Sequence, residues 1–392
     1  MEIRKLLPEE IDDHIKLSLY AFQAELSAED MERQRQLSEP EQVLVAVEQG
    51  TIRSKLHVIP LEIYLQGRRF LMGGVAGVAT WPEERRKGHV SVLLKHALAE
   101  MRSNGQTLSM LAPFHIGFYR KFGWELCVDL IKFTISKEKL PRRSESPGMI
   151  ERVEPKNAEV YPILQELYEV YASDFNSSLV RTPKWWENSV FRRKSGSAML
   201  YRSSAGTPEG YALYKVKDGV LTVKELVYLN EEAREGLWSF FSNHDSMIEK
   251  AEFESYSGDP LPYLLPDPRI EQSVHPYFMA RIVDAQAFVS QYPFLPGQRD
   301  SWRIRIEDPN ALWNEGEWEL TVDEQGKGSL ELAAAGSRDM LSASIGTWTA
   351  LLTGYSKAAT LTQTRQLQGP EQSAIKLAER IAARTPNLMD YF

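Results

Sequence analysis

A basic segment around residue 85 brings together residue types that suit phosphate binding. It runs Arg85-Arg86-Lys87-Gly88-His89-Val90 and falls between a run of small apolar residues and a long helical pattern. The first N–H groups of a helix are unpaired and attract negative charge, and glycine lets a ligand approach the backbone closely. Arg85 and Arg86 can add charge-assisted contacts to phosphate oxygens. The Gly-Lys-Ser/Thr ending of a P-loop is absent, and the plain alternative is a basic loop that caps a helix.

The elements on either side of this segment predict a mixed α/β domain. Helical spacing extends from Val90 to Met101, and Asn104-Gly105 can end that helix. Upstream, the pattern predicts a helix over 8–20 and strands over 43–47, 52–59, 61–65, 69–71 and 73–80. Downstream, it predicts a strand over 107–111, a turn that ends at Gly123 and a strand pair within 124–135. This order of elements favours phosphate binding over a plain helix cap.

The composition is that of a globular protein with no bias toward nucleic acid or membranes. The 392 residues include 46 lysines and arginines against 54 aspartates and glutamates, which gives a net charge of −8. Nucleic-acid binding needs a basic surface, and a membrane-spanning helix needs about 20 apolar residues; the sequence shows neither. Cys127 is the only cysteine and the seven histidines lack metal-ligand spacing, so we expect no disulfide and no metal. The N-terminal MEIRKLLPEE does not resemble a signal peptide, which predicts a cytoplasmic protein.

The length predicts two or three domains, at roughly 100–200 residues for each. A polar connection with three prolines spans 136–155. The middle region mixes predicted helices (158–171, 231–243) with predicted strands (198–202, 210–216, 220–228). After a strand at 277–283 and a helix at 284–291, the last region carries predicted strands (302–306, 318–322, 329–332) and helices (345–352, 371–384). We place the domains at 1–145, 146–284 and 285–392.

Two short motifs resemble those of a known family. Arg85-x-x-Gly88-x-Val90 is similar to the pyrophosphate-binding signature of the GNAT acetyltransferases, usually Arg/Gln-x-x-Gly-x-Gly/Ala, with Val90 in place of the last small residue. The run Phe118-Tyr119-Arg120-Lys121-Phe122-Gly123-Trp124 resembles the Tyr-x-x-Phe-Gly-aromatic motif of the Eis type within that superfamily. The later features Met279–Asp284, Ile345-Gly346 and Asp390-Tyr391-Phe392 are also similar, so the resemblance covers essentially the whole chain.

The resemblance implies a fold and a reaction. The fold is α/β (α+β): two tandem GNAT-like domains followed by a sterol-carrier-like domain whose C-terminus reaches the active site. The middle domain shows no Arg-x-x-Gly-x-Gly/Ala loop, so we expect it to lack its own CoA site. The reaction is direct transfer of acetyl from acetyl-CoA to an amine, without a metal. Eis-type relatives assemble as hexamers, which implies a homo-oligomer here.

The resemblance also assigns roles to individual residues. The cofactor-binding residues are those of the strand end and the basic loop: Val78, Ala79, Thr80, Arg85, Arg86, Lys87, Gly88, His89 and Val90. Tyr119 becomes the general acid that protonates the leaving thiolate. Without the resemblance, Tyr119 is better interpreted as a core residue of a phenylalanine-rich turn. The terminal carboxylate of Phe392 becomes the general base, because a chain-end carboxylate stays ionised at neutral pH; the alternative is that Tyr391 and Phe392 only dock the tail.

The acceptor pocket is less readable from the sequence. Phe22 and Glu25 lie where Eis-type enzymes place substrate-binding residues, and Asp390 is close to the terminus. Carboxylates there suit a small cationic acceptor such as an aminoglycoside or a polyamine, although each is also an ordinary surface acid. Tyr391 stands at a position that is acidic in some relatives, which argues against an aminoglycoside. Two rivals remain: a protein lysine acetyltransferase, and a non-catalytic protein that binds an apolar ligand in its third domain.

Overall fold

The computed structural model describes residues 1–141, 147–333 and 339–392 and confirms the predicted mixed α/β class. The predicted domain boundary at residue 145 falls outside the described residues. The first region contains β1 (Glu2–Lys5), α1 (Ile11–Phe22), α2 (Ala28–Leu37), β2 (Val43–Glu48), β3 (Thr51–Leu65), β4 (Arg68–Thr80), α3 (His89–Ser103), β5 (Leu108–Leu111), α4 (Ile116–Arg120) and β6 (Glu125–Ser136).

The second and third regions continue this alternation of helices and strands. The second contains β7 (Met149–Val153), α5 (Tyr161–Ser173), α6 (Pro183–Trp185), α7 (Phe191–Arg193), β8 (Ser197–Arg202), β9 (Pro208–Lys217), β10 (Val220–Tyr228), α8 (Glu231–Ser242), β11 (Lys250–Ser255), α9 (Leu261–Leu264) and β12 (Glu271–Ile282). The third contains α10 (Ala285–Gln291), β13 (Asp300–Glu307), β14 (Gly316–Val322), β15 (Gly328–Leu332), β16 (Leu341–Ser344), α11 (Ile345–Leu352), α12 (Ala358–Gln363) and α13 (Glu371–Ala378).

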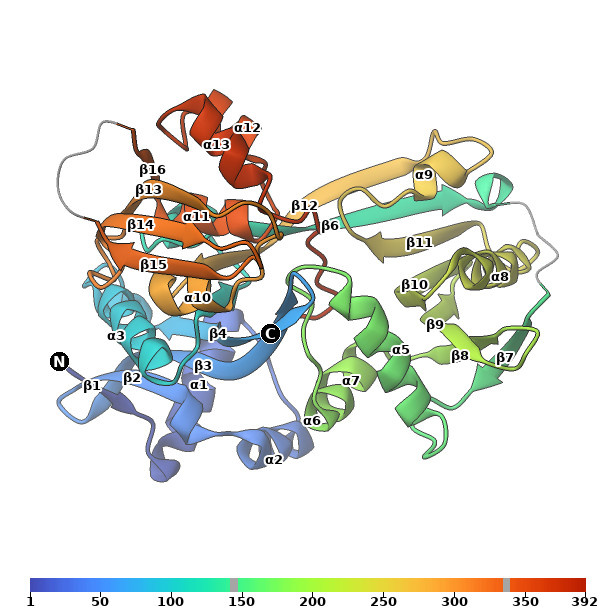
Figure 1. Cartoon of the computed structure of the whole chain (residues 1–392). Coiled ribbons are helices and arrows are strands. Elements are labelled where there is room, and N and C mark those ends of the chain that lie inside the picture. The colour runs from blue at the N-terminus through green and yellow to red at the C-terminus, as the bar shows by residue number, and fades with distance from the viewer. Residues whose placement is uncertain (142–146, 334–338) are drawn as a thin grey trace.

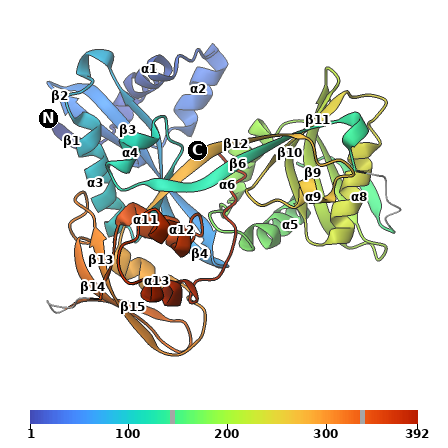
Figure 2. The same cartoon turned by 90° about the horizontal axis from the view of Figure 1, so that it is seen from above.

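The strands of the first two regions form one continuous sheet, in the order β1-β2-β3-β4-β5-β12-β6-β11-β10-β9-β8-β7. Strand β12, from the second region, lies between β5 and β6 of the first: Met279 pairs with Leu111 on one side and with Leu126 on the other. The far half of β6 pairs in turn with β11. Figures 1 and 2 show β6 and β12 running from one lobe of the molecule into the other. The two regions therefore exchange strands and share one sheet.

Several predicted strands are wrong in extent because long strands cross the breaks expected from the sequence. Residues 52–59 and 61–65 form the single strand β3, which continues through Pro60. Strand β2 begins at Val43, opposite His57, and the segment that pairs with the outer edge of β3 further on contacts Glu62 and Tyr64, so Pro60 lies in the gap between them, where a missing N–H is tolerated. The strand pair expected within 124–135 is likewise the one strand β6. Helix α13 ends at Ala378 instead of residue 384, where the Arg380 guanidinium donates to the carbonyls of Leu295 and Gln298.

Strands β4 and β5 open apart at the centre of the first region. They pair in parallel only from Met72 with Leu108 to Val75 with Leu111. Beyond Val75, β4 continues to Thr80 with β3 on one side and no partner from β5 on the other. A bulge interrupts the pairing with β3 at this point, and Gly77 there has a left-handed φ of +55°. The opening leaves a row of β4 main-chain groups free to bind a ligand.

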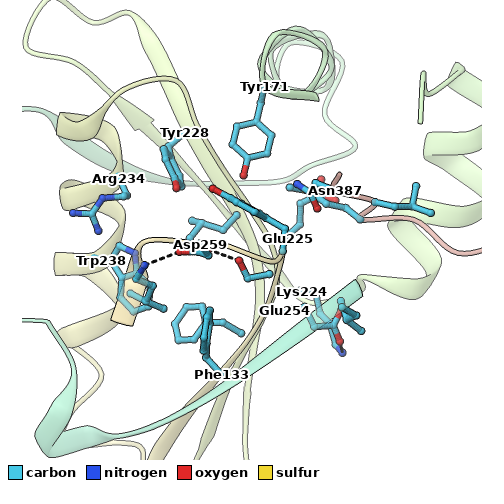
Figure 3. A pocket seen from close by; sticks show the side chains of 18 of the residues that line it. Phe133, Tyr171, Lys224, Glu225, Tyr228, Arg234, Trp238, Glu254, Asp259 and Asn387 are labelled. Atoms are coloured by element: carbon cyan, nitrogen blue, oxygen red, sulfur yellow. Dashed lines mark hydrogen bonds and ion pairs between the residues drawn. The ribbon is translucent and has the colours of Figure 1, made fainter. Parts of the chain in front are cut away.

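The second region also has two parallel strands that separate beyond a bulge, but different residues line the space between them. Strands β10 and β11 pair in parallel from Val220 to Val223, and a bulge follows between Val223 and Glu225. The side chains of Tyr171, Tyr228 and Trp238 surround the space beyond the pairing, which has a volume of only about 50 Å³ (Figure 3). Asn230 caps helix α8, and the first turn of that helix carries Glu231 and Glu232. The narrow opening and the capped, acidic start of α8 thus differ from the wider opening and the basic loop of the first region.

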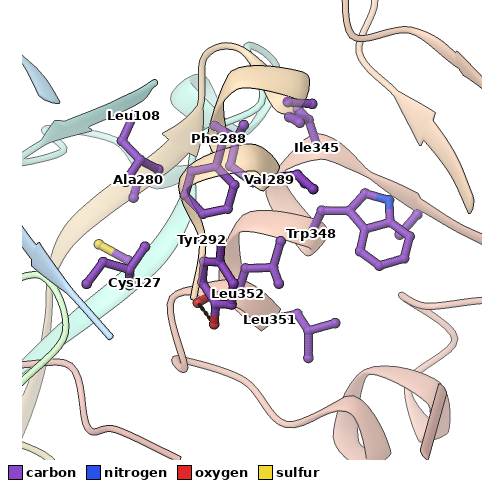
Figure 4. Close-up of a cluster of buried hydrophobic side chains, with 14 of the residues drawn as sticks. Leu108, Cys127, Ala280, Phe288, Val289, Tyr292, Ile345, Trp348, Leu351 and Leu352 are labelled. Carbon is purple, nitrogen blue, oxygen red and sulfur yellow. Dashed lines mark hydrogen bonds between the residues drawn. The ribbon is translucent and has the colours of Figure 1, made fainter. Parts of the chain in front are cut away.

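The third region packs its apolar residues against the first. Its strands form a sheet in the order β15-β14-β13-β16. Phe288, Trp348 and Leu352 of this region belong to one buried cluster with Leu108 and Cys127 of the first (Figure 4). After α13, the last residues of the chain leave this core and run between the other two regions, where the C-terminus lies in Figure 1. The apolar interior of the third region thus packs against the first region, and the C-terminal tail extends from it.

Candidate active site

The loop between β4 and α3 has the backbone shape of an anion-binding turn. Arg86 and Gly88 adopt left-handed φ values of +66° and +86°, and a non-glycine residue in that region is strained. No side chain caps the first turn of α3, which begins at His89. The N–H groups of this turn therefore stay available to an anion.

The charged side chains of this loop divide into two groups. Arg85 and Arg86 are exposed and form no ion pair within the described residues. Lys87, by contrast, donates to Glu84 Oε2 at 2.8 Å, and His89 is buried with Nε2 at 3.4 Å from the same oxygen. Arg85 and Arg86 are thus free to meet phosphates, while the Lys87 and His89 side chains hold the loop in place through Glu84.

The end of β4 presents main-chain groups beside this loop. Ser54 Oγ donates to the Ala79 carbonyl at 2.9 Å and contacts Thr80 Oγ1 at 2.7 Å, both from the β3 side. Val78 is half-buried and Ala79 is buried. The opposite edge of β4 faces the gap left by β5, so this edge could hold an extended arm of a cofactor by main-chain hydrogen bonds.

Tyr119 lies on α4, directly after β5, on the face of the sheet that α3 covers. It is 2% exposed and belongs to the same buried cluster as Val75 and Leu111, with Phe118 and Trp124 in edge-on ring contact. Burial raises the pKa of its hydroxyl. The phenol therefore stays protonated at neutral pH, as a proton donor must.

Phe392 reaches the β4–β5 opening from the opposite face of the sheet. A β-carbon built at Gly74 would lie 2.9 Å from Phe392 Cε2, whereas one at Gly73 would meet Met101 of α3. The Phe392 ring also contacts those of Phe278, at 4.8 Å between centroids, and Trp185, at 6.3 Å. The structure thus brings Phe392 and Tyr119 to the same opening from its two faces.

Asp390 has a different place from the one predicted. The residue is 3% exposed, and its carboxylate accepts hydrogen bonds from Arg181 Nε at 3.0 Å and Trp185 Nε1 at 3.0 Å. Tyr168 also donates to it, at 3.3 Å, and Tyr277 donates to its carbonyl at 3.0 Å. With its oxygens occupied in this way, the carboxylate anchors the tail and does not face an acceptor.

The anchor belongs to a buried charge network that the sequence did not reveal. The Arg181 guanidinium bridges Asp390 and Glu225, with 2.6 Å to the second carboxylate, and Lys194 also pairs with Glu225. Burial alone would raise the pKa of Glu225, but Arg181 and Lys194 lower it well below its usual range. Glu225 sits at the bulge of β10, so the second region's counterpart of the β4–β5 opening holds the end of the chain.

A cleft of about 1430 Å³ opens beside Phe392, between the first and second regions. Its walls come from β3, β4, the start of the chain and the segment from Val180 to Arg193, and Tyr391 and Phe392 close one side. Pockets for small ligands commonly measure about 300–1,000 Å³, so this cleft is not narrow. Phe22 and Glu25 are exposed and are not among its lining residues. The structure therefore does not join these two residues to the Phe392 site.

Comparisons with known proteins agree with this geometry. The acetyltransferase (GNAT) domain family matches residues 2–127, a second acetyltransferase (GNAT) family matches 177–282, and the sterol carrier protein domain family matches 285–389. A solved structure from Enterococcus faecalis V583, described as a probable N-acyltransferase of unknown function, is 32% identical, with a TM-score of 0.92 over 100% of this chain and 99% of that one. The chain belongs to the Eis-type GNAT acetyltransferases.

Other members of this family are more distant. N-acetyltransferase Eis of Mycobacterium tuberculosis is 25% identical over 233 residues, which cover 55% of this chain and 57% of that protein. An uncharacterized N-acetyltransferase of Streptomyces griseus is 24% identical over 51% of this chain and 53% of its own length. The chain thus spans about half the length of the curated relatives it matches. The structure of Eis1 from Mycobacterium abscessus shares the fold, with a TM-score of 0.83 at 19% identity over 100% of both chains.

The described part of the chain contains neither a metal-binding cluster nor a helix suited to crossing a membrane. No group of three or more histidine, cysteine, aspartate or glutamate side chains is placed to hold a metal ion. No helix combines the length and the apolar character needed to cross a bilayer. Cys127 is buried in β6, where burial raises the pKa of its thiol. This Eis-type chain therefore offers no cysteine nucleophile at its candidate site.

Proposed function

We propose that the chain is an acetyl-CoA-dependent N-acetyltransferase that transfers acetyl directly to an amine. The observation that carries this proposal is the approach of Phe392 and Tyr119 to the β4–β5 opening from its two faces. A base on one side and an acid on the other match a reaction in which an amine attacks a thioester and a thiolate leaves. The uncapped start of α3 lies at the end of the same strand.

The residues present fit acetyl-CoA, which would supply the acetyl thioester. The N–H groups at the start of α3, with Arg85 and Arg86, would hold the pyrophosphate. Val78, Ala79 and Thr80 would hold the pantetheine arm along the free edge of β4. Gly88, Lys87, His89 and Val90 shape the loop and the first helical turn, and Lys87 and His89 act through Glu84.

Proton transfers at both groups accompany the reaction. The terminal carboxylate of Phe392 removes a proton from the acceptor ammonium, directly or through one water; a chain-end carboxylate has an ordinary pKa of about 3.5 and is ionised at neutral pH. The Tyr119 phenol gives its proton to the sulfur as the C–S bond breaks, and the second proton of the attacking nitrogen leaves to the resulting phenolate or to water. Asp390 acts as a positioning residue, since it holds the tail through Arg181.

The acceptor class is less constrained than the reaction. The aminoglycoside or polyamine that the family resemblance implies depends on carboxylates at Glu25 and Asp390, and neither faces the cleft. The width of the cleft suits a protein lysine as a second candidate acceptor. A homo-oligomer, a hexamer by resemblance, and a cytoplasmic location remain proposals that light scattering and cell fractionation would test.

The test follows the release of free CoA with a thiol reagent, with acetyl-CoA and a panel of amines. Tyr119→Phe should lower kcat by about 10²-fold or more, which is the usual contribution of general acid catalysis. Tyr263→Phe, at a residue that is 91% exposed, is the matched control. Converting the terminal carboxylate to an amide removes the proposed base without added bulk, and extra residues after Phe392 would block it sterically. Full turnover by the amide form would remove Phe392 from the mechanism, and absence of acetyl-CoA binding would refute the proposed function.

A further inference from the structure

Three basic side chains lie together at the wall of the cleft beside Phe392: two of them line it, and the third, Lys55, is buried behind them. His14 of α1 and His57 of β3 line the cleft, with 5.0 Å between their ring centroids. Lys55, two residues before His57, is 1% exposed and places Nζ at 3.5 Å from His57 Nε2 and at 2.5 Å from Ser18 Oγ. All three side chains are on the face of the sheet where Phe392 lies.

No carboxylate balances these bases among the side chains of the described residues. Burial lowers the pKa of Lys55 to about 7, and no acidic side chain acts to raise it. Burial and the Lys55 charge lower the pKa of His14 to about 3, and the same causes lower that of His57. His14 is 3% exposed and its Nδ1 is buried without a hydrogen-bond partner. Buried bases of this kind are costly unless something pairs with them.

The remaining charges of the cleft wall reinforce this excess of bases. Among the lining carboxylates of the described residues, Glu39 pairs with Lys184 and Glu169 pairs with Arg69, which leaves Glu62 without an ion pair. Arg192 and Arg193 line the opposite wall and likewise form no ion pair in that part of the chain. Besides Glu62, the terminal carboxylate of Phe392 is a free anion at the cleft, so a polycation would meet two free carboxylates, whereas an anion at the His14 and His57 end would meet only bases.

The position of the bases relative to Phe392 indicates that they contact the acceptor. Ile59 pairs with Gly74, against which the Phe392 ring packs, and His57 pairs with Ala76 further along the same strands. Two residues of a strand span roughly 7 Å, so the bases lie one side-chain repeat from the Phe392 ring. A compact acceptor could therefore place its amine at the opening between β4 and β5 and a second group at His57.

Building on the acetyltransferase function proposed above, we propose that His14 and His57, with the buried Lys55 behind them, bind an anionic group of the acceptor. The acceptor is then an amine that also carries a carboxylate or a phosphate, and not a polycation. The Lys55 ammonium can only donate, so with Lys55 charged His57 Nε2 accepts and its Nδ1 carries the N–H. An anion beside these groups favours their charged forms, so its binding takes up protons.

The kinetic test compares acceptors with and without the anionic group. L-Phenylalanine is compared with L-phenylalaninamide, and glucosamine 6-phosphate with glucosamine, as kcat/KM at saturating acetyl-CoA. We expect at least a tenfold preference for the anionic member of one pair, and the pair that shows it distinguishes carboxylate from phosphate. Lys55→Met and His57→Asn should abolish the preference, whereas Lys16→Met, on the exposed face of α1, should keep it. An equal loss of kcat for charged and neutral acceptors in Lys55→Met would show a proton-transfer role and overturn the proposal.

A binding test separates this inference from the proposed function. N-Acetyl-L-phenylalanine and N-acetylglucosamine 6-phosphate, with their uncharged counterparts, are titrated without acetyl-CoA by calorimetry in two buffers of different ionisation enthalpy. Tighter binding of a charged probe with proton uptake, both lost in Lys55→Met, supports the site even where no acetyl transfer is seen. Turnover of neutral amines with no binding of either anionic probe at millimolar concentration would overturn the inference and leave the function standing. Binding of anions only after amidation of Phe392 would show that the chain end occupies the bases, which also overturns it.

Discussion

The Phe392 ring packs directly over Gly74, at the last stretch where β4 and β5 still pair. The glycine leaves room for the ring because it has no β-carbon. The contact joins the end of the chain to the strand that borders the proposed thioester site.

Gly74→Ala should therefore displace the tail from the opening. The added methyl would come within 2.9 Å of Phe392 Cε2 and of Leu61 Cδ1. We expect kcat to fall at least tenfold with little change in the KM for acetyl-CoA, because the cofactor loop is not touched. Gly73→Ala is the matched control, since its methyl meets the flexible Met101 on the other face. Equal losses in the two variants would contradict a specific role for Phe392.

Asp390→Asn should destabilise the protein and loosen its tail together. Removing one partner of a buried ion pair leaves an uncompensated charge and costs about 3–5 kcal/mol. Arg181 keeps Glu225, so we expect the lower end of that range, measured by urea unfolding. Asp174→Asn, at an exposed carboxylate, should change the free energy of unfolding little. A stable Asp390→Asn protein with full activity would show that the anchor is dispensable.

The buried Lys55 should make stability depend on pH above neutrality. Its pKa is about 7 in the folded chain and about 10.4 when unfolded, so folding favours the neutral amine. The cost of burying the ammonium is complete below pH 7 and is relieved as the pH rises toward 10. Lys55→Met should raise the free energy of unfolding at pH 7 and flatten its rise between pH 7 and 10. Parallel curves for the variant and the parent would indicate that Lys55 does not titrate in this range.

Arg85→Gln and Arg86→Gln should weaken CoA binding without changing the chemical step. Both side chains are exposed and free to meet phosphates, so each loss should raise the Kd of CoA several-fold and leave kcat nearly unchanged. The effect should shrink at high salt because the contact is electrostatic. Lys121→Gln serves as the control at a cation away from the loop. A fall in kcat with unchanged CoA affinity would assign the arginines to another role.

Local patterns in the sequence predicted much of the first region. The spacing from Val90 to Met101 predicted the helix observed at His89–Ser103, and the basic loop before it has the expected uncapped start. The position of β12 could not be predicted, because it depends on pairing with strands far away in the sequence. Arg181, Lys55 and His57 carry no local pattern that marks them. These residues stand out only in the folded chain, because they are buried or half-buried in it: Arg181 has two carboxylate partners there, whereas no acidic side chain pairs with Lys55 among the described residues.

The exchange of β12 between the two lobes also constrains how the chain is made. Strand β12 lies between β5 and β6 and ends at Ile282. The first lobe therefore cannot complete its sheet until the chain has been synthesised beyond Ile282. Until then, the edges of β5 and β6 are exposed, and the nascent chain is prone to pairing with other strands. A fragment cut at the connection between the lobes would lack the same strand. The proposed acetyltransferase site is therefore assembled only when both lobes and the tail have been synthesised.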